Sequence, residues 1–523
     1  MTPFLALFLV LQQHPVQDHA WTSPPSGDTV GYWQQRVSYR IVATLDERRG
    51  VASGVADLTY VNQSPDTLRE LYFHQHLNAF RPGSAWSLAD VREGRIRFQS
   101  LPDPEYAYER FTAVPTIDGV QVPARYPGAP DSTVVHFALP RPLLPGDSVR
   151  VHFQWDARPS TLPRRQGRRR RSFDFAQWYP RVAVYDRGGW QPNALVPAGE
   201  FYGEFGTYDV TLVLPQDQVI GATGVPVEGD PGWQRALRWG TVHPMTNAYP
   251  RVPDAPPAMV PAGFRKVRFL ANDVHHFAWS SSPDYRYEGG IYLRESRVRA
   301  RFPVWDTVAV HVLYQPGDTA TWGKGIAVER TVTALRWLEQ IYGPYGYPQM
   351  TNLHRIEGGG TEFPMMMMNG SPSQGLILHE GGHIFTHGIL GNNEWRSGWM
   401  DEGLTSYQTS WFAGATPQDR PAQPPPTSQP GRTVGYRGRA VRLDPLFAAA
   451  LGQQRLVHVG RAEPLGTRAD EFNEFAIYNS AVYTRAEIMY GALREVLGDS
   501  AFRAFLHDYY ARWAFKHVDE LAM

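Results

Sequence analysis

The stretch from His379 to His383 reads His-Glu-Gly-Gly-His, and its residue types and spacing indicate metal chemistry. Residues four apart share one face of a helix, so the two imidazoles can bind one ion with Glu380 beside it. Glu402 lies 19 positions after His383 (402 − 383) and is the natural third ligand. Two histidines and one carboxylate suit zinc and leave a fourth position for water. The pattern therefore predicts a hydrolytic site with one zinc ion; the alternative is a polar helix face with hydrogen-bonded histidines.

Two helices must position these side chains. Residues 371–374, Ser-Pro-Ser-Gln, combine a capping serine, a proline at the first helical position and a glutamine at the third. The first helix is predicted to end at Gly391-Asn392, and a second runs from about residue 399 to 412, with Glu402 in its first turn. His387 lies one turn beyond the second histidine, which carries it about 6 Å along the axis. We expect His387 to support a ligand or to lie on the surface.

The first half of the chain has the pattern of antiparallel β structure. Apolar and polar residues alternate over short segments, with Gly, Pro, Asn and Asp between them. The clearest segments are at residues 39–45, 54–61, 149–155 and 208–214.

After Asp284 the pattern changes to that of an α/β domain. Residues 308–314 are predicted as a strand and residues 327–342 as a helix, and the apolar run Met365–Met368 is predicted as a buried strand. We therefore divide the chain into an N-terminal β domain at 22–285 and a catalytic domain at 286–523. Residues 1–21 are treated as a signal or a disordered segment.

Composition excludes several other classes of function. The 523 residues include no cysteine, so disulfides, thiol catalysis and thiolate metal sites are ruled out. The formal net charge is zero, which gives no reason to expect nucleic acid as a partner. No segment approaches the roughly 20 apolar residues of a membrane span. The short apolar run at residues 4–11 resembles the core of a secretory signal, so we expect a secreted or periplasmic protein. A cytoplasmic location stays open because the basic residues of such a signal are missing.

Two segments stand out without belonging to the site. Residues 164–171 read Arg-Arg-Gln-Gly-Arg-Arg-Arg-Arg, a run that could bind acidic substrates or a polyanion, although a solvated loop is the preferred interpretation. Residues 416–431 are rich in proline and glutamine and are predicted to be a flexible insert.

Together the motifs resemble the zinc aminopeptidase family that includes aminopeptidase N and leukotriene hydrolase, a family of gluzincins. The resemblance rests on His-Glu-x-x-His, eighteen intervening residues and Glu, and on residues 359–363, Gly-Gly-Thr-Glu-Phe. The latter segment is similar to that family's Gly-x-Met-Glu-Asn exopeptidase signature. The resemblance implies a multidomain α+β protein, with a saddle-like β domain followed by a thermolysin-like catalytic domain. The family's C-terminal helical domain is expected to be absent, since the chain ends forty residues after Tyr483 (523 − 483).

The resemblance also implies roles for individual residues. The signature's glutamate binds the free α-amine of the substrate in that family, which assigns this role to Glu362. Gly359 and Gly360 beside it allow an extended peptide to approach the backbone. A tyrosine after the third ligand stabilises the oxyanion, and residues 481–486 assign this role to Tyr483. Residues 472–497 have helical spacing and are predicted as one helix, and two other tyrosines of that helix, Tyr478 and Tyr490, stay open as alternatives.

The expected activity is hydrolysis of N-terminal residues from peptides by zinc-activated water, with Glu380 as the general base. Two departures from the family signature stand out: Thr361 and Phe363 replace its Met and Asn, and Glu362 precedes His379 by only 17 positions (379 − 362). One alternative is a zinc endopeptidase of the thermolysin type, which uses the same ligands. Another is a non-catalytic scaffold or a truncated inactive fragment that retains the zinc site. The intact general base argues against this second alternative.

Overall fold

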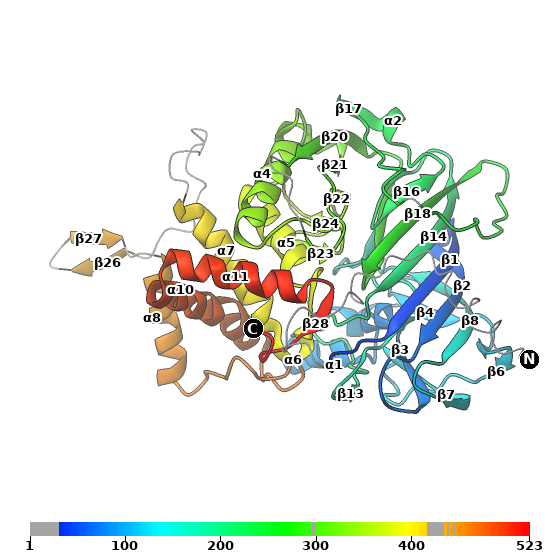
Figure 1. Ribbon diagram of the computed structural model, residues 1–523, viewed down its shortest axis with the longest axis horizontal. Coiled ribbons are helices and arrows are strands. Elements are labelled where there is room, and N and C mark those ends of the chain that lie inside the picture. Colours follow the sequence, from blue (N-terminus) through cyan, green and yellow to red (C-terminus); the bar gives the residue numbers. More distant parts are fainter. Residues whose placement is uncertain (1–30, 250, 295–299, 416–432, 437–438, 443–444) are drawn as a thin grey trace, which may run out of the picture.

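The computed structural model describes residues 31–249, 251–294, 300–415, 433–436, 439–442 and 445–523. The predicted signal segment at 1–21 and the predicted insert at 416–431 lie outside these ranges. A nine-stranded sheet forms the right side of the molecule, a second sheet lies near the middle of the view, and most helices lie to its left (Figure 1). The order of strands in the first sheet is β16 (Val225–Glu228), β18 (Phe264–Val274), β14 (Gly206–Pro215), β1 (Arg36–Asp46), β2 (Val51–Val61), β8 (Ser148–Arg158), β5 (Thr116–Ile117) and β6 (Val120–Gln121), with β4 (Tyr108–Phe111) beside β8.

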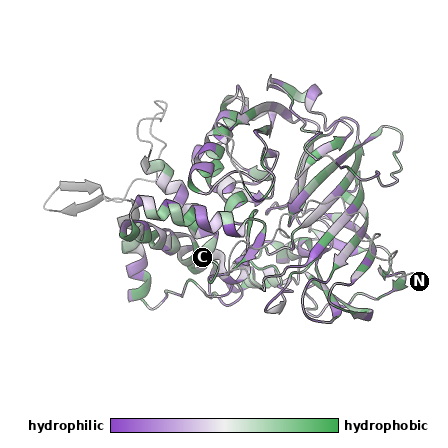
Figure 2. Ribbon diagram, viewed as in Figure 1, coloured by the Kyte–Doolittle hydropathy of each residue, from purple (hydrophilic) through white to green (hydrophobic). Residues whose placement is uncertain are grey.

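The four strands predicted from alternation lie within β1, β2, β8 and β14. Burial alternates along β2 because one face of the sheet packs on the core, and apolar and polar residues alternate along these strands in Figure 2. The sheet is not wholly antiparallel, because β1 pairs in parallel with β14. A long connection separates these two strands, and a parallel pair requires one. Smaller sheets complete this half: β15 (Val219–Ala222), β19 (Trp279–Ser282), β10 (Ser172–Phe175) and β9 (Gly167–Arg169); β11 (Arg181–Val182), β3 (Leu68–His74) and β7 (Val134–Leu143); and β12 (Tyr185–Asp186) with β13 (Gly189–Trp190).

Large aromatic side chains fill the core of the first half. Trp155 on β8 is fully buried, and its indole N–H donates to the carbonyl of Trp178 at 2.7 Å. The ring lies over Gly54 of the neighbouring strand, where an added Cβ would overlap it. Trp178 in turn donates to the carbonyl of Phe277 at 3.0 Å. These bonds satisfy the polar atoms of the two indoles, so both rings can be buried without an unpaired donor.

The second sheet is mixed, and it carries the segment that resembles the exopeptidase signature. Helices α4 and α5 pack against its strands. Strand β23 lies at one end of the sheet, antiparallel to β24, and β24 contains most of the predicted methionine strand. The strand order is β17 (Leu237–Gly240), β20 (Arg286–Leu293), β21 (Thr307–Tyr314), β22 (Gln349–His354), β24 (Met366–Asn369) and β23 (Gly360–Phe363). Because β17 precedes residue 285 and pairs with β20, the division of the chain at that residue stays a prediction.

The helices follow in the second half, apart from two short ones. They are α1 (Ala85–Arg92), α2 (Trp233–Ala236), α3 (Thr319–Trp322), α4 (Ile326–Ile341), α5 (Gln374–Thr386), α6 (Glu394–Ser397), α7 (Glu402–Ala415), α8 (Pro445–His458), α9 (Phe475–Asn479), α10 (Ala486–Leu497) and α11 (Asp499–Trp513). A π-helical turn, Ser480–Arg485, joins α9 to α10 within the helix predicted from the sequence. The hairpin β26 (Thr433–Tyr436) and β27 (Arg439–Arg442) extends to the left in Figure 1.

Both predicted ends of the first metal-binding helix are wrong. The N-cap of α5 is Ser373, whose hydroxyl accepts from the N–H of Leu376 at 3.3 Å, so the helix begins two residues later than the capping pattern indicated. The helix ends at Thr386, because β25 (Leu390–Asn392) pairs in parallel with β28 (Lys516–Val518) near the end of the chain. Local sequence patterns cannot predict a pairing between residues so far apart in the chain.

The arginine-rich run at 164–171 is only in part the solvated segment that was predicted, because residues 169–171 are exposed but residues 165–167 are buried. Part of it forms β9 in a hairpin with β10. Arg164 and Arg165 contact the carboxylates of Glu357 and Glu200, and Arg165 is buried. The local charge density suggested solvent, but the carboxylates that neutralise it come from distant parts of the chain.

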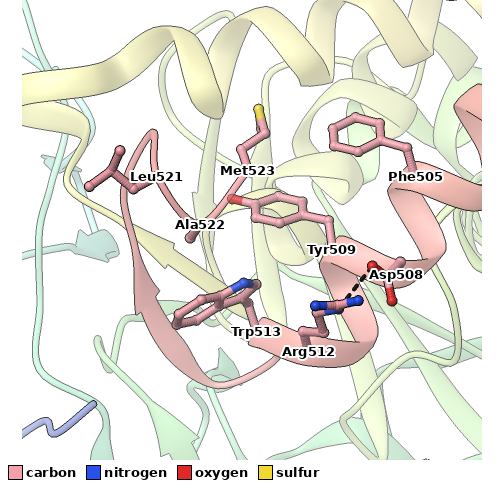
Figure 3. A pocket seen from close by; sticks show the side chains of 8 residues that line it. All are labelled: Phe505, Asp508, Tyr509, Arg512, Trp513, Leu521, Ala522 and Met523. Atoms are coloured by element: carbon pink, nitrogen blue, oxygen red, sulfur yellow. Dashed lines mark ion pairs between the residues drawn. The ribbon is translucent and has the colours of Figure 1, made fainter. Parts of the chain in front are cut away.

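Figure 3 shows a cavity of about 370 Å³ between α11 and residues 521–523. Phe505, Tyr509 and Trp513 line one side, and the ion pair of Arg512 with Asp508 at 2.8 Å lies at its edge. None of these residues belongs to the predicted site. Within the described residues, no helix combines the length and the apolar character needed to cross a bilayer.

Replacement of Trp155 tests the packing of the first half. We expect Trp155→Ala to lower the free energy of unfolding by about 3 to 5 kcal/mol, because it leaves a cavity over Gly54 and removes a hydrogen bond. Guanidinium unfolding followed by circular dichroism measures this change. Val114→Ala is the control, since Val114 is half exposed and its truncation should stay within about 0.5 kcal/mol. Equal effects of the two substitutions would contradict the packing described.

Candidate active site

Helices α5 and α7 bring the three predicted metal ligands together. His379 and His383 lie on α5, and Glu402 is the first residue of α7. Gly382 lets the helices approach closely, because an added Cβ would come within 2.6 Å of Nε2 of Gln408. That amide nitrogen donates to the carbonyl of Leu378 on α5 at 2.7 Å. The glycine that weakens α5 as an isolated helix therefore permits the contact that places Glu402.

The ligand atoms converge at the spacing of a metal site. Nε2 of His379 and Nε2 of His383 lie 3.2 Å apart. Oε2 of Glu402 lies 3.4 Å from the first nitrogen and 3.1 Å from the second. Ligands 2.0 to 2.1 Å from a tetrahedral zinc ion would be about 3.3 Å apart. The buried Oε2 of Glu402 has no hydrogen-bond partner among the described residues. The donor set and its spacing therefore fit zinc.

Asp401 orients the second histidine, and the sequence analysis missed this residue. Its Oδ2 accepts from Nδ1 of His383 at 2.7 Å, which leaves the lone pair of Nε2 directed toward the other two ligands. The hydroxyl of Thr386 donates to the other carboxylate oxygen. Burial acts to raise the pKa of Asp401, but His383 and a hydrogen bond from Glu394 lower it overall. The sequence feature that could have indicated Asp401 was its position immediately before the predicted ligand Glu402.

The charges of the site favour a cation at its centre. Burial lowers the pKa of His383, but the carboxylates of Asp401 and Glu402 more than offset this and raise it well above its usual value. Burial likewise acts to raise the pKa of Glu402, whereas His383 and His379 lower it to about 2. Both directions mean that positive charge between these side chains is stabilised. A divalent metal ion supplies such charge.

Glu380 lies beside the ligands in a buried position. Burial raises its pKa to about 7, with a contribution from Glu362, while the two histidines lower it. A carboxylate with such a pKa is suited to take and return protons near neutral pH. The side chain packs directly on Gly360, where any added Cβ would overlap the Glu380 carboxyl group. The sequence analysis assigned Gly360 only to substrate approach, but in the structure it also makes room for Glu380.

Glu362 projects from the end strand β23 into the same space. One carboxylate oxygen of Glu362, one of Glu380 and a nitrogen of His383 lie within 4.8 Å of one another. Glu362 is only 8% exposed, and its Oε1 has no hydrogen-bond partner among the described residues. Gly359, two residues before Thr361, has φ of +73°, a conformation that favours glycine at the turn into this strand. The structure thus brings Glu362 to the predicted metal site.

The three candidate tyrosines differ in what they contact. The hydroxyl of Tyr483 donates to Oε1 of Glu402, and its ring stacks 6.2 Å from that of His379. Tyr478 packs edge-on against Tyr483, and Tyr490 donates to the sulfur of Met523 at 3.6 Å. Within the described part of the chain, Tyr483 is the one of the three that hydrogen-bonds to a candidate ligand. Burial and Glu402 raise the pKa of Tyr483, so its hydroxyl keeps its proton and can donate.

The π-helical turn that contains Tyr483 gives it this position. Such turns interrupt a regular helix and often occur at functional sites. The sequence analysis predicted one regular helix here, because periodicity over so few residues does not distinguish the two.

His387 does not lie at the metal site or on the surface. It is buried, with Nδ1 3.0 Å from the amide oxygen of Asn392 and Nε2 3.4 Å from Glu394. Burial raises the pKa of Glu394, as does the nearby Asp401. His387 therefore supports the site through Glu394 and Asp401.

Comparison with known proteins agrees with this geometry. Residues 366–523 match the domain of peptidase family M1. The segment that carries the candidate metal ligands, residues 366–523, thus matches the M1 metallopeptidases, and the resemblance seen in the sequence is confirmed. No curated protein sequence matches the chain.

The overall fold is similar to solved M1 structures. An M1 zinc metallopeptidase from Deinococcus radiodurans has a TM-score of 0.58 and 17% identity over 97% of this chain and 91% of that chain. A mutant of it bound to a Tyr-Ser-Ala substrate has a TM-score of 0.58 and 17% identity over 94% and 89%. A mutant two-domain M1 zinc metallopeptidase bound to L-tryptophan gives 0.58 and 17% over 97% and 92%. The predicted order of an N-terminal β domain and a catalytic domain is therefore confirmed.

Asp401→Asn tests the orientation of His383. We expect zinc affinity to fall by about 10- to 100-fold, because the amide holds the imidazole less firmly than the carboxylate does. Competition with a chelator measures the affinity, and Asp470→Asn, at an exposed carboxylate, is the control. An unchanged affinity in Asp401→Asn would show that the contact has no role in binding.

Gly360→Ala tests the packing of the general base. The new methyl group displaces the Glu380 carboxyl group, and we expect kcat/KM to fall by about 100-fold while metal content is retained. Gly375→Ala on α5 is the matched control, since its Cβ would meet nothing within 4 Å. Peptidase assays with metal analysis distinguish the two, and equal activities would contradict the role of Gly360.

Proposed function

We propose that this M1 peptidase is a zinc-dependent aminopeptidase that removes N-terminal residues from peptides. The observation that carries the proposal is the position of Glu362. A buried carboxylate oxygen without a partner among the described residues lies within 4.8 Å of Glu380 and His383. A carboxylate there suits the α-ammonium of the first residue, whose carbonyl belongs to the bond that is cut. The Deinococcus radiodurans structure with a Tyr-Ser-Ala substrate supports peptides as the substrate class.

His379, His383 and Glu402 would hold the zinc ion. When bound there, zinc supplies electrophilic polarisation of the scissile carbonyl and of the attacking water. Asp401 keeps the His383 ring in the required tautomer, with its proton on Nδ1 and the lone pair of Nε2 available. The metal ligands are thus prepared by the packing of α5 on α7 before any substrate arrives.

Glu380 and Tyr483 carry the proton and charge chemistry. Glu380 accepts the proton of the attacking water and later delivers it to the leaving amine, and its pKa of about 7 suits both transfers. Tyr483 donates a hydrogen bond where negative charge develops on the carbonyl oxygen. A donor of this kind typically contributes about 3 kcal/mol to transition-state stabilisation.

Glu362 and β23 determine which bond is cut. The Glu362 carboxylate forms charge-assisted hydrogen bonds with the substrate α-ammonium, which places the first peptide bond beside Glu380. Because β23 is the end strand of its sheet, an extended peptide can align along its backbone. Gly359 and Gly360 carry no side chain that would obstruct this approach.

Substitution of Glu362 tests the proposal. Wild-type enzyme should hydrolyse aminoacyl-anilides and leave N-acetylated peptides intact. Glu362→Ala should lower kcat/KM for the free-amine substrates by about 100-fold, because a charge-assisted bond to the ammonium is lost. Steady-state assays on both substrate classes measure this, with zinc content determined on each preparation.

Glu380→Gln is the second variant in this experiment, and it should bind zinc without turnover. Internal cleavage of N-acetylated peptides that is unaffected by Glu362→Ala would instead indicate an endopeptidase of the thermolysin type. Stoichiometric zinc without hydrolysis in the wild type would indicate a non-catalytic scaffold.

A further inference from the structure

Arg165, from the arginine-rich run, lies buried among the residues that surround the substrate amine site. Its guanidinium forms an ion pair with the Glu200 carboxylate, and both side chains are less than a tenth exposed. Its backbone N–H donates to Oε2 of Glu357 at 2.8 Å, and its φ of +59° turns the chain sharply at this point. The N-terminal half of the chain thus contributes a fixed cation and a fixed anion to the catalytic half.

Several contacts connect this ion pair to the strand that carries Glu362. Arg355 donates to the hydroxyl of Thr361 and to the carbonyl of Gly358, in the loop that follows Glu357. These bonds connect the loop that holds the Arg165 backbone directly to β23.

A second connection runs through aromatic rings. The Arg165 guanidinium lies 5.1 Å from the ring of Phe201, which packs 5.3 Å from the ring of His276. His276 in turn lies 6.3 Å from Phe363, the neighbour of Glu362. The Glu362 carboxylate also acts to raise the pKa of both Arg165 and Glu200, so the ion pair lies within electrostatic reach of the proposed amine site.

The polar atoms of this group are incompletely satisfied. Nε of Arg165, Oε2 of Glu200 and Oε1 of Glu362 are all buried, and none has a hydrogen-bond partner among the described residues. Buried donors and acceptors are normally paired. Two carboxylate oxygens and one guanidinium N–H are therefore available to a polar ligand, such as the first residue of a peptide.

The charges decide what kind of first residue fits. Where Glu200 is ionised, Glu362 and Glu200 each contribute one negative charge and Arg165 one positive charge, so these three side chains have a net charge of −1 (−1 − 1 + 1). One α-ammonium balances this charge. Without Arg165 the group would hold one positive charge less, which would suit a second positive charge on the substrate.

We propose that Arg165, paired with Glu200, is a specificity-determining residue that removes the preference this acidic site would otherwise have for a basic first residue. The proposal rests on the proposed aminopeptidase function. It assigns no chemical step to Arg165, which acts through the charge that it places beside the substrate.

The test measures how the first residue's charge affects hydrolysis. The substrates are the anilides of Arg, Leu and Glu, and the enzymes are the wild type, Arg165→Gln, Glu200→Gln and the double variant. Ratios of kcat/KM between two substrates on one preparation do not depend on the amount of folded enzyme. Assays are run at about pH 8, because burial raises the pKa of Glu200 to about 8 and the substrate α-amine loses its proton at higher pH.

Opposite effects are expected from the two single variants. Arg165→Gln should raise the ratio of Arg to Leu by about tenfold and lower the ratio of Glu to Leu, since it leaves one more negative charge. Glu200→Gln should shift both ratios in the other direction. The double variant should return to within about threefold of the wild type, since the charges again cancel.

Arg171→Gln is the matched control within the same run. Arg171 is half exposed and pairs with Glu47 and Asp217, so its loss should leave the ratios unchanged. Equal losses on all three substrates in Arg165→Gln and Glu200→Gln would show a purely structural pair and overturn the proposal. If a single variant fails to fold, the wild type still decides, because a preference for Arg over Leu of tenfold or more contradicts the proposal. Absence of hydrolysis of any anilide by the wild type would refute the aminopeptidase function instead.

Discussion

Three atoms with lone pairs, Nε2 of His379, Nε2 of His383 and Oε2 of Glu402, lie 3.1 to 3.4 Å apart, and the rest of the catalytic half depends on this convergence. Such atoms repel one another unless a cation lies between them. The surroundings strengthen this requirement, because Asp401 raises the pKa of His383 and adds a further negative charge. The local order of α5 and α7 is therefore tied to metal binding.

The support for this convergence comes from close packing of helices and strands. Gly382 allows Gln408 to bond across to α5, and Gly360 allows Glu380 to lie against β23. At both positions a methyl group would separate elements that must touch. Glycine lowers the intrinsic stability of a helix or strand, but here the tertiary contacts that it permits hold the reacting groups in place.

The two halves of the chain cooperate at the amine site. The catalytic half provides Glu362, and the N-terminal half provides Arg165 and Glu200. Under the proposed function, Glu362 together with this ion pair accepts one ammonium group, which is the feature common to all peptide N-termini. The Arg165–Glu200 ion pair lies where the two halves of the chain meet. The same pair therefore contributes both to the contact between the halves and to the charge near the proposed substrate site.

The sequence by itself predicted the candidate ligand set and the candidate general base, and it determined the class of fold. The spacing of His379 and His383 is a helical spacing, and the alternation along β1, β2, β8 and β14 is a strand spacing, so short-range periodicity was sufficient. The family resemblance added Glu362 and Tyr483, and the structure brings both of them to the ligands.

Only the tertiary structure decided which charges meet. The end of α5, the contact of Asp401 with His383 and the burial of Arg165 each depend on partners that are distant in sequence or on an exact turn of the chain. The sequence predicts a solvated run of arginines because the carboxylates that pair with Arg164 and Arg165 lie dozens of residues away in the chain. Local patterns report the periodicity of one element, whereas the pairing of buried charges depends on how separate elements pack together.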